Sequence, residues 1–320
     1  MRKLVSIISP CYNGAKYLPA FLDSIVSQTY RPIELLFVDD GSNDNTKEVF
    51  ESYRERLIQS NITPIYFFQE NSGQASAINR ALPHFEGDYM MWMDSDDILM
   101  PDNISKKVSY LEEHPEKGFV LCQGEIVHAN DVSTSIGTLA RKAQEPLDNL
   151  KLFEDLIMER NVVYVPATIM ASRQAVLASI PTLHIYEGRQ GQNWQLMLPL
   201  AFSNQYGLIE EPLFKYVIHE DSHSHANRTY IQSVARCNEF EKLISFTIDV
   251  IPKASKKEKE FWKKKCHVKY LKIKLQLAYQ NIDKEHENTI RKELKENGEY
   301  SFQDSRLRYN IGKIKRMIVG

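Results

Sequence analysis

Short apolar runs alternate with amphipathic stretches along the first hundred residues. Each run has the length and composition of a buried strand, and the four runs are Leu4–Ser9, Glu34–Val38, Pro64–Phe68 and Tyr89–Met93. The stretches between them carry apolar residues at helical spacing, as at Leu18, Phe21, Leu22, Ile25 and Val26. Strands that alternate with helices predict an α/β protein with a mainly parallel, doubly wound sheet.

Beyond Pro101 the alternation is less regular. The elements it predicts are a helix to about His114, strands at Phe119–Leu121 and Glu125–Val127, a loop or lid over residues 128–149, a helix at Asn193–Phe202 and a strand at Leu213–Ile218. From Tyr230 the pattern is helical and rich in lysine, with breaks at Pro252 and around Asn297–Gly298. We therefore predict a main domain at residues 1–225 and a helical, basic region at residues 226–320.

Composition adds a charge asymmetry to this picture. The 320 residues are 42% hydrophobic and 26% charged, which is ordinary for a globular protein. The net charge of −2 conceals a basic end, because residues 251–320 hold 19 Lys and Arg against 9 Asp and Glu. An acidic body suits a site for a divalent cation, and a basic tail suits an anionic surface.

The four cysteines and the apolar runs bear on localisation. Cys11, Cys122, Cys237 and Cys266 are far apart and match no zinc or disulfide pattern, so we expect reduced thiols. The first apolar run is too short for a signal peptide, and no run approaches the length of a membrane span. We expect a cytoplasmic protein whose membrane contacts are peripheral, on the inner face of the cell membrane.

Polar clusters follow three of the predicted strands. They are Ser9–Gly14, Asp39–Ser42 and Asp94–Asp97. In a doubly wound sheet ligands bind outside the carboxyl ends of the strands, so these clusters are expected to line one cleft. The alternatives are a plain turn between strand and helix for the first cluster and a helix cap for the second.

The third cluster has the chemistry of a metal site. Asp94, Asp96 and Asp97 lie within four residues and repel one another unless a cation is present. Hard oxygen ligands suit Mg²⁺ or Mn²⁺, and such an ion neutralises charge on a departing diphosphate. The alternative is an exposed acidic loop that caps the helix near Pro101.

Together these segments resemble family 2 of the inverting glycosyltransferases, whose catalytic domain has the GT-A nucleotide-sugar-binding fold. The resemblance runs from about Val5 to Asp102 and rests on the order and spacing of several motifs. They are Val5–Asn13, Ser27–Tyr30, Glu34–Thr46, Asn71–Gln74 with Asn79, and Gly87–Tyr89 leading into Asp94–Asp97. It implies a nucleotide-binding half at residues 1–102 and an acceptor half at residues 103–225.

The resemblance also implies residue roles. Pro10, Tyr12 and Asp40 match positions that hold the uracil ring of a UDP-sugar, and Asp94 and Asp96 match the DxD pair that meets ribose and metal. The full donor site implied is Pro10, Tyr12, Asn13, Asp39, Asp40, Gly73, Gln74, Asp94 and Ser95.

The second half departs from the family's pattern. Many members carry an acidic pair on the helix after the acceptor loop, with an Asp as general base, whereas this chain has Gln192 and Asn193. Amides accept no proton near neutral pH, so Asn193 marks the position of the usual acid and Glu187 is the candidate base. The alternative for Glu187 is a solvated loop residue.

Neighbouring residues complete the predicted acceptor and metal sites. Trp194 and Gln195 are expected to line the acceptor pocket by stacking on a sugar and by hydrogen bonding, with a place in the core as the alternative for Trp194. Tyr216–His219 resembles the family's closing Tyr-Arg-x-His segment, with Val217 in place of arginine. His219 is therefore a candidate metal ligand, and a structural histidine is the alternative.

The basic tail allows several partners. Lysines and aromatic residues at 256–274 can lie on an anionic membrane and bring the protein to a lipid-linked acceptor. A solvated helix and a homodimer contact are the alternatives, and no nucleic-acid-binding motif accompanies the charge.

Three functional classes remain in play. The leading one is a metal-assisted hexosyltransferase that uses a UDP-sugar, set in bacterial surface-polysaccharide synthesis as a family-level expectation. The second is a nucleotide-sugar-binding protein without turnover, suggested by the amides. The third is a nucleotidyltransferase on a similar sheet, disfavoured because no GxGxxG or Walker loop appears.

Overall fold

The computed structural model describes residues 2–142, 147–188, 191–220 and 228–309. The chain divides into two units, the first formed by residues 1–223 with 250–254 and the second by residues 224–249 with 255–320. The first unit is built on a nine-stranded mixed sheet, and the second is helical where it is described.

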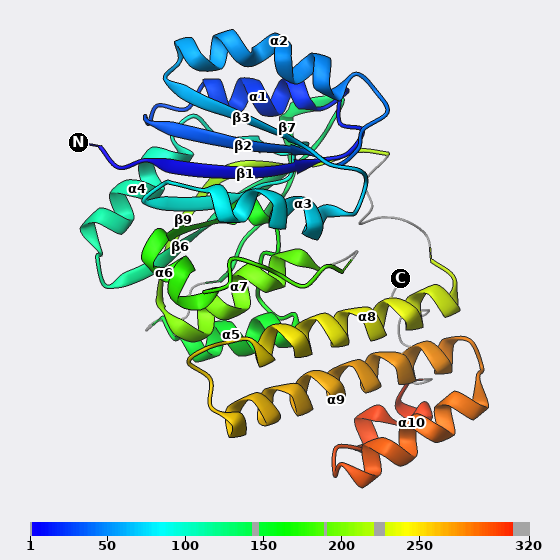
Figure 1. Ribbon diagram of the computed structural model, residues 1–320. Helices are drawn as coiled ribbons and strands as arrows, with labels where there is room; N and C mark the ends of the chain where they lie inside the picture. The colour runs from blue at the N-terminus through cyan, green and yellow to red at the C-terminus, as the bar shows by residue number, and fades with distance from the viewer. Residues whose placement is uncertain (1, 143–146, 189–190, 221–227, 310–320) are drawn as a thin grey trace. The chain divides into compact units, whose positions relative to one another are not determined.

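The first half of the sheet is parallel, as predicted. Its strands β3 (Ile62–Phe68), β2 (Ile33–Asp39), β1 (Val5–Cys11) and β4 (Tyr89–Trp92) lie in that order (Figure 1). The order reverses between β1 and β4, because the chain moves outward from β1 through β2 to β3 and then returns to the other side of β1. That reversal is a topological switch point at the carboxyl ends of β1 and β4, and open α/β sheets bind their ligands in the crevice expected there.

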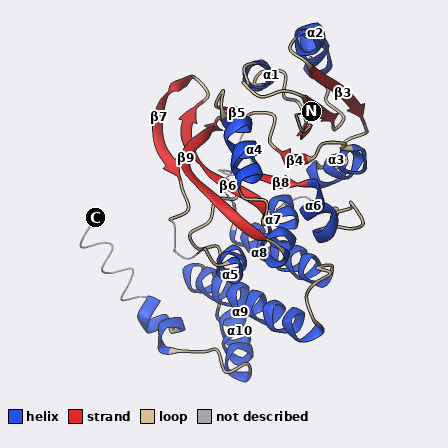
Figure 2. Ribbon diagram, turned by 90° about the vertical axis from the view of Figure 1, so that its left-hand side faces the viewer, coloured by secondary structure: helices blue, strands red, loops and turns tan. Residues whose placement is uncertain are grey.

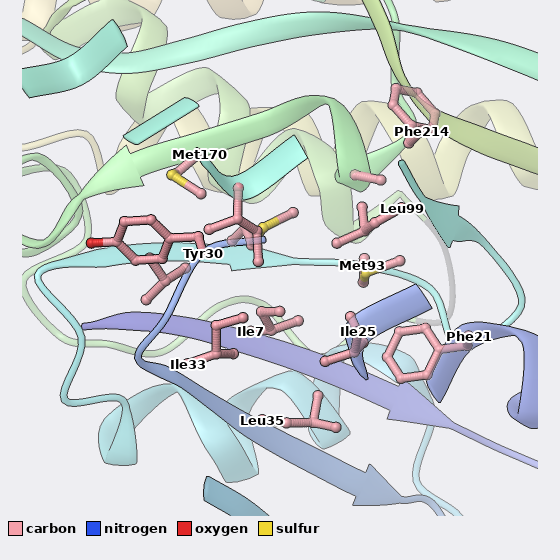
Figure 3. Close-up of a cluster of buried hydrophobic side chains, with 14 of the residues drawn as sticks. Ile7, Phe21, Ile25, Tyr30, Ile33, Leu35, Met93, Leu99, Met170 and Phe214 are labelled. Atoms are coloured by element: carbon pink, nitrogen blue, oxygen red, sulfur yellow. The ribbon is translucent and has the colours of Figure 1, made fainter. Parts of the chain in front are cut away.

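Alternate residues of these strands face a common core. Val5, Ile7, Ile33, Leu35 and Met91 are fully buried and belong to one apolar cluster. The helices that cover this face are α1 (Leu18–Val26), α2 (Thr46–Gln59) and α4 (Asn103–Glu113). Figure 3 shows part of this cluster, in which side chains of β1 and β2 meet those of α1. The helix α3 (Gln74–Ala81), followed by the short helix η1 (Leu82–His84), packs against β1 and β2.

The second half of the sheet is mixed. It contains β8 (Ile169–Ser172), β6 (Lys117–His128), β9 (Gln205–Ile218) and the short β5 (Ile98–Leu99). The pairs β4–β8, β8–β6 and β9–β5 are antiparallel, whereas β6 and β9 are parallel. Its helices are α5 (Asn149–Met158), η2 (Pro166–Thr168), α6 (Arg173–Ser179) and α7 (Gln192–Ser203).

One predicted loop is a strand. The prediction of a loop or lid over 128–149 is wrong at Asp131–Leu139, which forms β7 and pairs with β6 after a two-residue turn. Figure 2 shows β7 following the curve of β6 and β9. Most of its side chains are exposed, so the strand lacks the apolar alternation that marks a half-buried strand, and its pairing comes from the length of β6.

The second unit is helical, as the tail pattern predicted. Its helices are α8 (Tyr230–Asp249), α9 (Lys256–Gln280) and α10 (Lys284–Glu296), followed by η4 (Phe302–Asp304). The His267 ring of α9 joins its neighbours, because Nδ1 lies 2.5 Å from an oxygen of Glu241 on α8 and Nε2 lies 2.9 Å from one of Glu293 on α10. The sequence analysis did not predict the break between α9 and α10 at Asn281–Asp283, where Ile282 has a positive φ of 58°.

Two further features concern membrane spans and cysteines. None of the helices within the described ranges is long and apolar enough to cross a bilayer. All four cysteines lie in described segments and are buried thiols.

Candidate functional site

The carboxyl ends of β1, β2 and β4 meet at one edge of the sheet. Beyond the paired strands the backbone still holds these ends together, because Asp40 N–H donates to the Cys11 carbonyl at 2.8 Å and Met93 N–H donates to the Ile8 carbonyl at 3.0 Å. The three polar clusters predicted from the sequence therefore lie beside one another.

The loop after β1 interlocks with the loop after β2. Asn13 N–H donates to Ser42 Oγ at 2.9 Å, and Gly14 N–H donates to Thr46 Oγ1 at the same distance. A Cβ at Gly14 would lie 2.3 Å from Cys11 Sγ, so any larger residue there would force the buried Cys11 side chain to move. This rigid loop leaves Tyr12 48% exposed at the crevice rim, while Pro10 is buried inside β1.

The Asp39–Asp40 pair fastens two neighbouring segments. Asp39 accepts hydrogen bonds from Ser42 N–H at 2.8 Å and from the Tyr66 hydroxyl at 2.6 Å. The helix cap proposed as an alternative for this pair is wrong, because α2 begins after Asn45.

The Asp40 carboxylate holds the loop that leads into α3. Its oxygens accept from Gln69 Nε2 at 2.7 Å, from Ser72 N–H at 2.9 Å and from Gly73 N–H at 2.8 Å. Gly73 has a φ of +92°, a conformation that glycine adopts without strain, and it precedes the first residue of α3, Gln74. Asp40 and Gly73 thus form one side of the crevice.

The three carboxylates after β4 form a compact cluster. One oxygen from each of Asp94, Asp96 and Asp97 lies within 4.8 Å of the others. Asp97 is 1% exposed; its Oδ1 accepts from Val217 N–H at 3.1 Å, and its buried Oδ2 has no hydrogen-bond partner in the described part of the chain. Val217, which stands where the family has arginine, thus serves the cluster through its backbone.

Burial and repulsion between carboxylates raise the pKa values of two groups in this cluster. Burial, with the charge of Asp96 beside it, raises the pKa of Asp94 to about 7. Burial and the charges of Asp96 and Asp94 raise the pKa of Asp97 well above its ordinary value. Both shifts show that burial, together with the neighbouring carboxylates, disfavours the charged form of these two groups.

His219, the residue after the end of β9, adjoins the cluster. Its Nε2 lies 2.9 Å from Asp96 Oδ2, and its ring stacks on Tyr17 with centroids 4.0 Å apart. Ser95 points back to the sheet, where its hydroxyl bonds the buried thiol of Cys11.

The residues present fit a divalent metal ion. A buried carboxylate oxygen without a partner, two further carboxylates within reach and a neighbouring imidazole are the oxygen-rich donor set that Mn²⁺ or Mg²⁺ takes. Asp94, Asp96 and Asp97 would hold the ion, with His219 at their edge.

The first residues of α7 contact the structure beneath them. Asn193 accepts from Trp92 Nε1 at 3.2 Å and donates to the Tyr164 carbonyl at 2.8 Å. Trp194 is 7% exposed and its indole N–H donates to the Leu156 carbonyl at 3.1 Å, so it lies in the core, as the alternative prediction held.

Gln195 and Asn79 hold the loop that carries Glu187. Gln195 is buried and bonds both the N–H and the carbonyl of Tyr186, at 2.6 and 2.8 Å. Asn79 of α3 does the same for Ile185, at 2.7 and 2.8 Å. The Glu187 side chain is 55% exposed, 3.4 Å from Asn79 Nδ2 and 4.0 Å from His184 Nε2.

Sequence reasoning missed the partners that support these residues. Tyr17, Tyr66 and Gln69 contact His219, Asp39 and Asp40 respectively, yet each belongs to a segment read only as a helix start, a strand or a loop. Gln192 was noted as an amide, but its bond to Gln74 had no signal in the sequence.

Comparison with known proteins finds one family. The family model described as "Glycosyl transferase family 2" matches residues 6–176, more than half of the chain. An uncharacterized glycosyltransferase of Rickettsia typhi is 36% identical over 125 residues, covering 39% of this chain and 37% of that protein. The putative teichuronic acid biosynthesis glycosyltransferase TuaG of Bacillus subtilis is 35% identical over 112 residues, covering 35% of this chain and 43% of that protein. The chain thus spans less than half the length of either relative.

Two solved structures share the fold. TarS 1–349 of S. aureus in complex with UDP-GlcNAc has a TM-score of 0.59 and 18% identity, covering 92% of each chain. The mannosyltransferase PcManGT of Pyrobaculum calidifontis, in complex with GDP-Man and Mn²⁺, has a TM-score of 0.59 and 15% identity, covering 98% of this chain and 81% of that chain. The predicted GT-A fold is thereby confirmed.

The raised pKa of Asp94 predicts a pH-dependent metal affinity. We expect Mn²⁺ to bind about tenfold more weakly at pH 6 than at pH 8, because at the lower pH it must displace a proton from this carboxyl. In the metal-free protein the folded state holds that proton more tightly than the unfolded state, so the free energy of unfolding should fall as the pH rises from about 4 to about 7. Calorimetry and thermal melting across this range measure both effects.

The control for this prediction is Asp94→Asn. It should reduce the dependence of the melting temperature on pH in the metal-free protein. An Mn²⁺ affinity that does not change between pH 6 and pH 8 would contradict the prediction.

Proposed function

Because the chain belongs to glycosyl transferase family 2, we propose that it transfers a sugar from a UDP-sugar to a hydroxyl of a glycan or lipid-linked saccharide. The transfer inverts the anomeric carbon, is assisted by Mn²⁺ or Mg²⁺, and serves bacterial surface-polysaccharide synthesis. Support for the setting comes from the relative named for teichuronic acid biosynthesis, and support for the donor from the TarS complex with UDP-GlcNAc.

The observation that carries the proposal is the acidic cluster at the switch point of the sheet. Asp94, Asp96 and Asp97 lie at the end of β4, next to the crevice between β1 and β4. Anionic side chains attract a diphosphate only through a cation. A cation bound here would neutralise charge on the departing diphosphate.

The loops around the cluster would bind the donor. Tyr12 offers an exposed ring on which a uracil base can stack, and Asp40, which is buried beside Asp39, would accept a hydrogen bond from the ring's N–H group. Because Asp40 already binds Ser72 and Gly73, the base would meet a preformed wall. Pro10, Asn13 and Ser95 would shape this pocket through the backbone.

Glu187 would act as the general base. The attacking hydroxyl of the acceptor must give up its proton, and Glu187 is an exposed carboxylate on a loop held by Asn79 and Gln195. Asn193 stands at the usual acid's position and is bonded to Trp92 and Tyr164. Trp194 and Gln195 would serve the acceptor site indirectly, by supporting its wall.

The start of α9 is our candidate for peripheral contact with a membrane. Lys256, Lys257 and Lys264 are exposed there, and Phe261 is 52% exposed beside Trp262. Farther along, Lys269 is buried and Lys274 pairs with Glu241 at 3.2 Å, so the proposed surface is shorter than the 256–274 segment read from the sequence. Exposed lysines with an aromatic side chain suit an anionic leaflet.

The donor proposal predicts metal-dependent nucleotide binding. We expect UDP to bind more tightly than GDP and to require Mn²⁺, and we expect Asp96→Asn to weaken UDP binding in Mn²⁺ by about 100-fold, since even outer-shell changes at metal sites cost about 10–100-fold. Calorimetric titration of each nucleotide with and without Mn²⁺ measures this.

Asp23→Asn, a matched change on the exposed face of α1, should leave binding unchanged. If neither nucleotide binds under any condition, the donor assignment fails. A preference for GDP would retain a nucleotide-sugar donor but replace uracil recognition.

The base proposal predicts a loss of turnover without a loss of binding. Glu187→Gln should lower kcat by about 10²- to 10⁴-fold, the usual contribution of a general base, and leave UDP binding intact. Release of UDP from UDP-sugars, screened with saccharide and lipid-linked acceptors, provides the assay.

Glu210→Gln, on an exposed part of β9, is the matched control. An unchanged kcat in Glu187→Gln would remove the named base. Wild-type protein that binds UDP yet turns over no UDP-sugar would favour the alternative of a nucleotide-sugar-binding protein, and release of pyrophosphate from a nucleoside triphosphate would favour a nucleotidyltransferase.

The membrane proposal predicts binding to anionic vesicles. Replacing Lys256 and Lys257 with Gln should weaken binding to phosphatidylglycerol vesicles about 30-fold, because each lysine near the surface contributes about 1 kcal/mol. The matched double change at Lys284 and Lys292 of α10, which are also exposed, should have little effect. Equal binding to neutral phosphatidylcholine vesicles, or a dimer that stays off both vesicles, would contradict the proposal.

A further inference from the structure

Two glutamine side chains connect the start of α7 to the acidic cluster. Gln74 is the first residue of α3, and its Nε2 donates to Asp94 Oδ1 at 2.5 Å. Gln192 is the first residue of α7, and its Nε2 donates to Gln74 Oε1. The bonds run in sequence from α7 through α3 to the end of β4, three elements far apart along the chain.

The chemistry of the three groups fixes the direction of these bonds. When Asp94 is ionised, as it must be to hold a metal ion, it only accepts hydrogen bonds, so Gln74 then turns its NH₂ group towards it. The carbonyl oxygen of Gln74 then faces Gln192, which must supply a donor. An amide at residue 192 can do so, whereas an ionised carboxylate of the same shape cannot.

A second contact holds the start of α7 over β4. Asn193 Oδ1 accepts from Trp92 Nε1 at 3.2 Å, and Trp92 ends β4 two residues before Asp94. The neighbouring residues 192 and 193 therefore reach the same strand end by separate routes. The Asn193–Trp92 bond restricts where the neighbouring Gln192 amide can lie, and so supports the bond from Gln192 to Gln74.

We propose that Gln74 and Gln192 form an amide latch that orients the Asp94 carboxylate for the metal ion of the nucleotide-sugar donor. The latch rests on the proposed function, and both glutamines are positioning residues. Gln74 acts directly on Asp94, and Gln192 acts through Gln74 by keeping its amide turned towards the carboxylate. Through the latch, the helix at the acceptor side and the metal-binding loop hold one another in place.

The latch predicts an order among three variants in Mn²⁺ affinity, measured by calorimetry in the presence of UDP. Gln74→Leu should weaken Mn²⁺ binding by about 10–100-fold, the usual effect of removing an outer-shell partner. Gln192→Leu should change it by no more than about threefold, because Gln74 can still donate to Asp94. Gln192→Glu should weaken it by about tenfold or more, because the new carboxylate draws the Gln74 NH₂ group away from Asp94.

The third variant is decisive because charge alone predicts the opposite result. A carboxylate added beside a cation site should strengthen metal binding if residue 192 has no role in orienting Gln74. Gln59→Glu, an equal change on the exposed face of α2, is the control for net charge and should leave the affinity unchanged. Melting of the metal-free variants by circular dichroism checks that each is folded, and Gln192→Met replaces Gln192→Leu if the latter is not.

Steady-state kinetics supply a further measurement, the dependence of activity on Mn²⁺, that would not change if Gln192 had a purely structural role. In Gln192→Glu the Mn²⁺ concentration for half-maximal activity should rise about tenfold, while kcat at saturating Mn²⁺ changes less. Stronger or unchanged Mn²⁺ binding in Gln192→Glu, or unchanged binding in Gln74→Leu, would overturn the latch while leaving the proposed function intact. Wild-type protein that binds neither Mn²⁺ nor UDP would overturn the proposed function, and the latch with it.

Discussion

Repulsion among three carboxylates at the end of β4 is the constraint on which the rest of the site depends. Asp94, Asp96 and Asp97 place their oxygens within 4.8 Å of one another, and burial raises the pKa of two of them. Such a cluster persists in a fold only if protonation or neighbouring groups reduce its charge. The protein recruits them from distant segments: a backbone N–H of Val217, the imidazole of His219 and the amide of Gln74.

The other side of the crevice is formed by Asp39 and Asp40, whose carboxylates already accept hydrogen bonds from the chain itself. Asp39 and Asp40 accept hydrogen bonds from the turn after β2, from β3 and from the loop before α3. The crevice therefore has one wall fixed before any ligand arrives and one wall whose charge awaits a cation. In the proposed function, preorganisation of the first wall would lower the ordering cost of donor binding, and the second wall would make that binding depend on a metal ion.

The sequence predicts the parallel half of the fold and its three polar clusters because both depend on local patterns. The strands β1, β2 and β4 are buried apolar runs, and parallel topology brings their carboxyl ends together. The second half was harder to read, because β7 carries mostly exposed residues and its pairing is decided by β6. The partners of the carboxylates, such as Tyr66 and Gln192, could not be predicted, since contacts between side chains distant in sequence leave no periodic signal.

The role of the amides at the start of α7 follows from their contacts and not from their residue type alone. Gln192 and Asn193 cannot take a proton, which by itself suggests a site that has lost its chemistry. Their contacts give a different reason for amides. Asn193 donates to the Tyr164 carbonyl and Gln192 donates to Gln74, and an ionised carboxylate at either residue could not donate these bonds. A helix start committed in this way to the scaffold cannot also supply the base. Under the proposed function the base would come from a neighbouring segment with an accessible carboxylate, and the loop held by Asn79 and Gln195 presents Glu187.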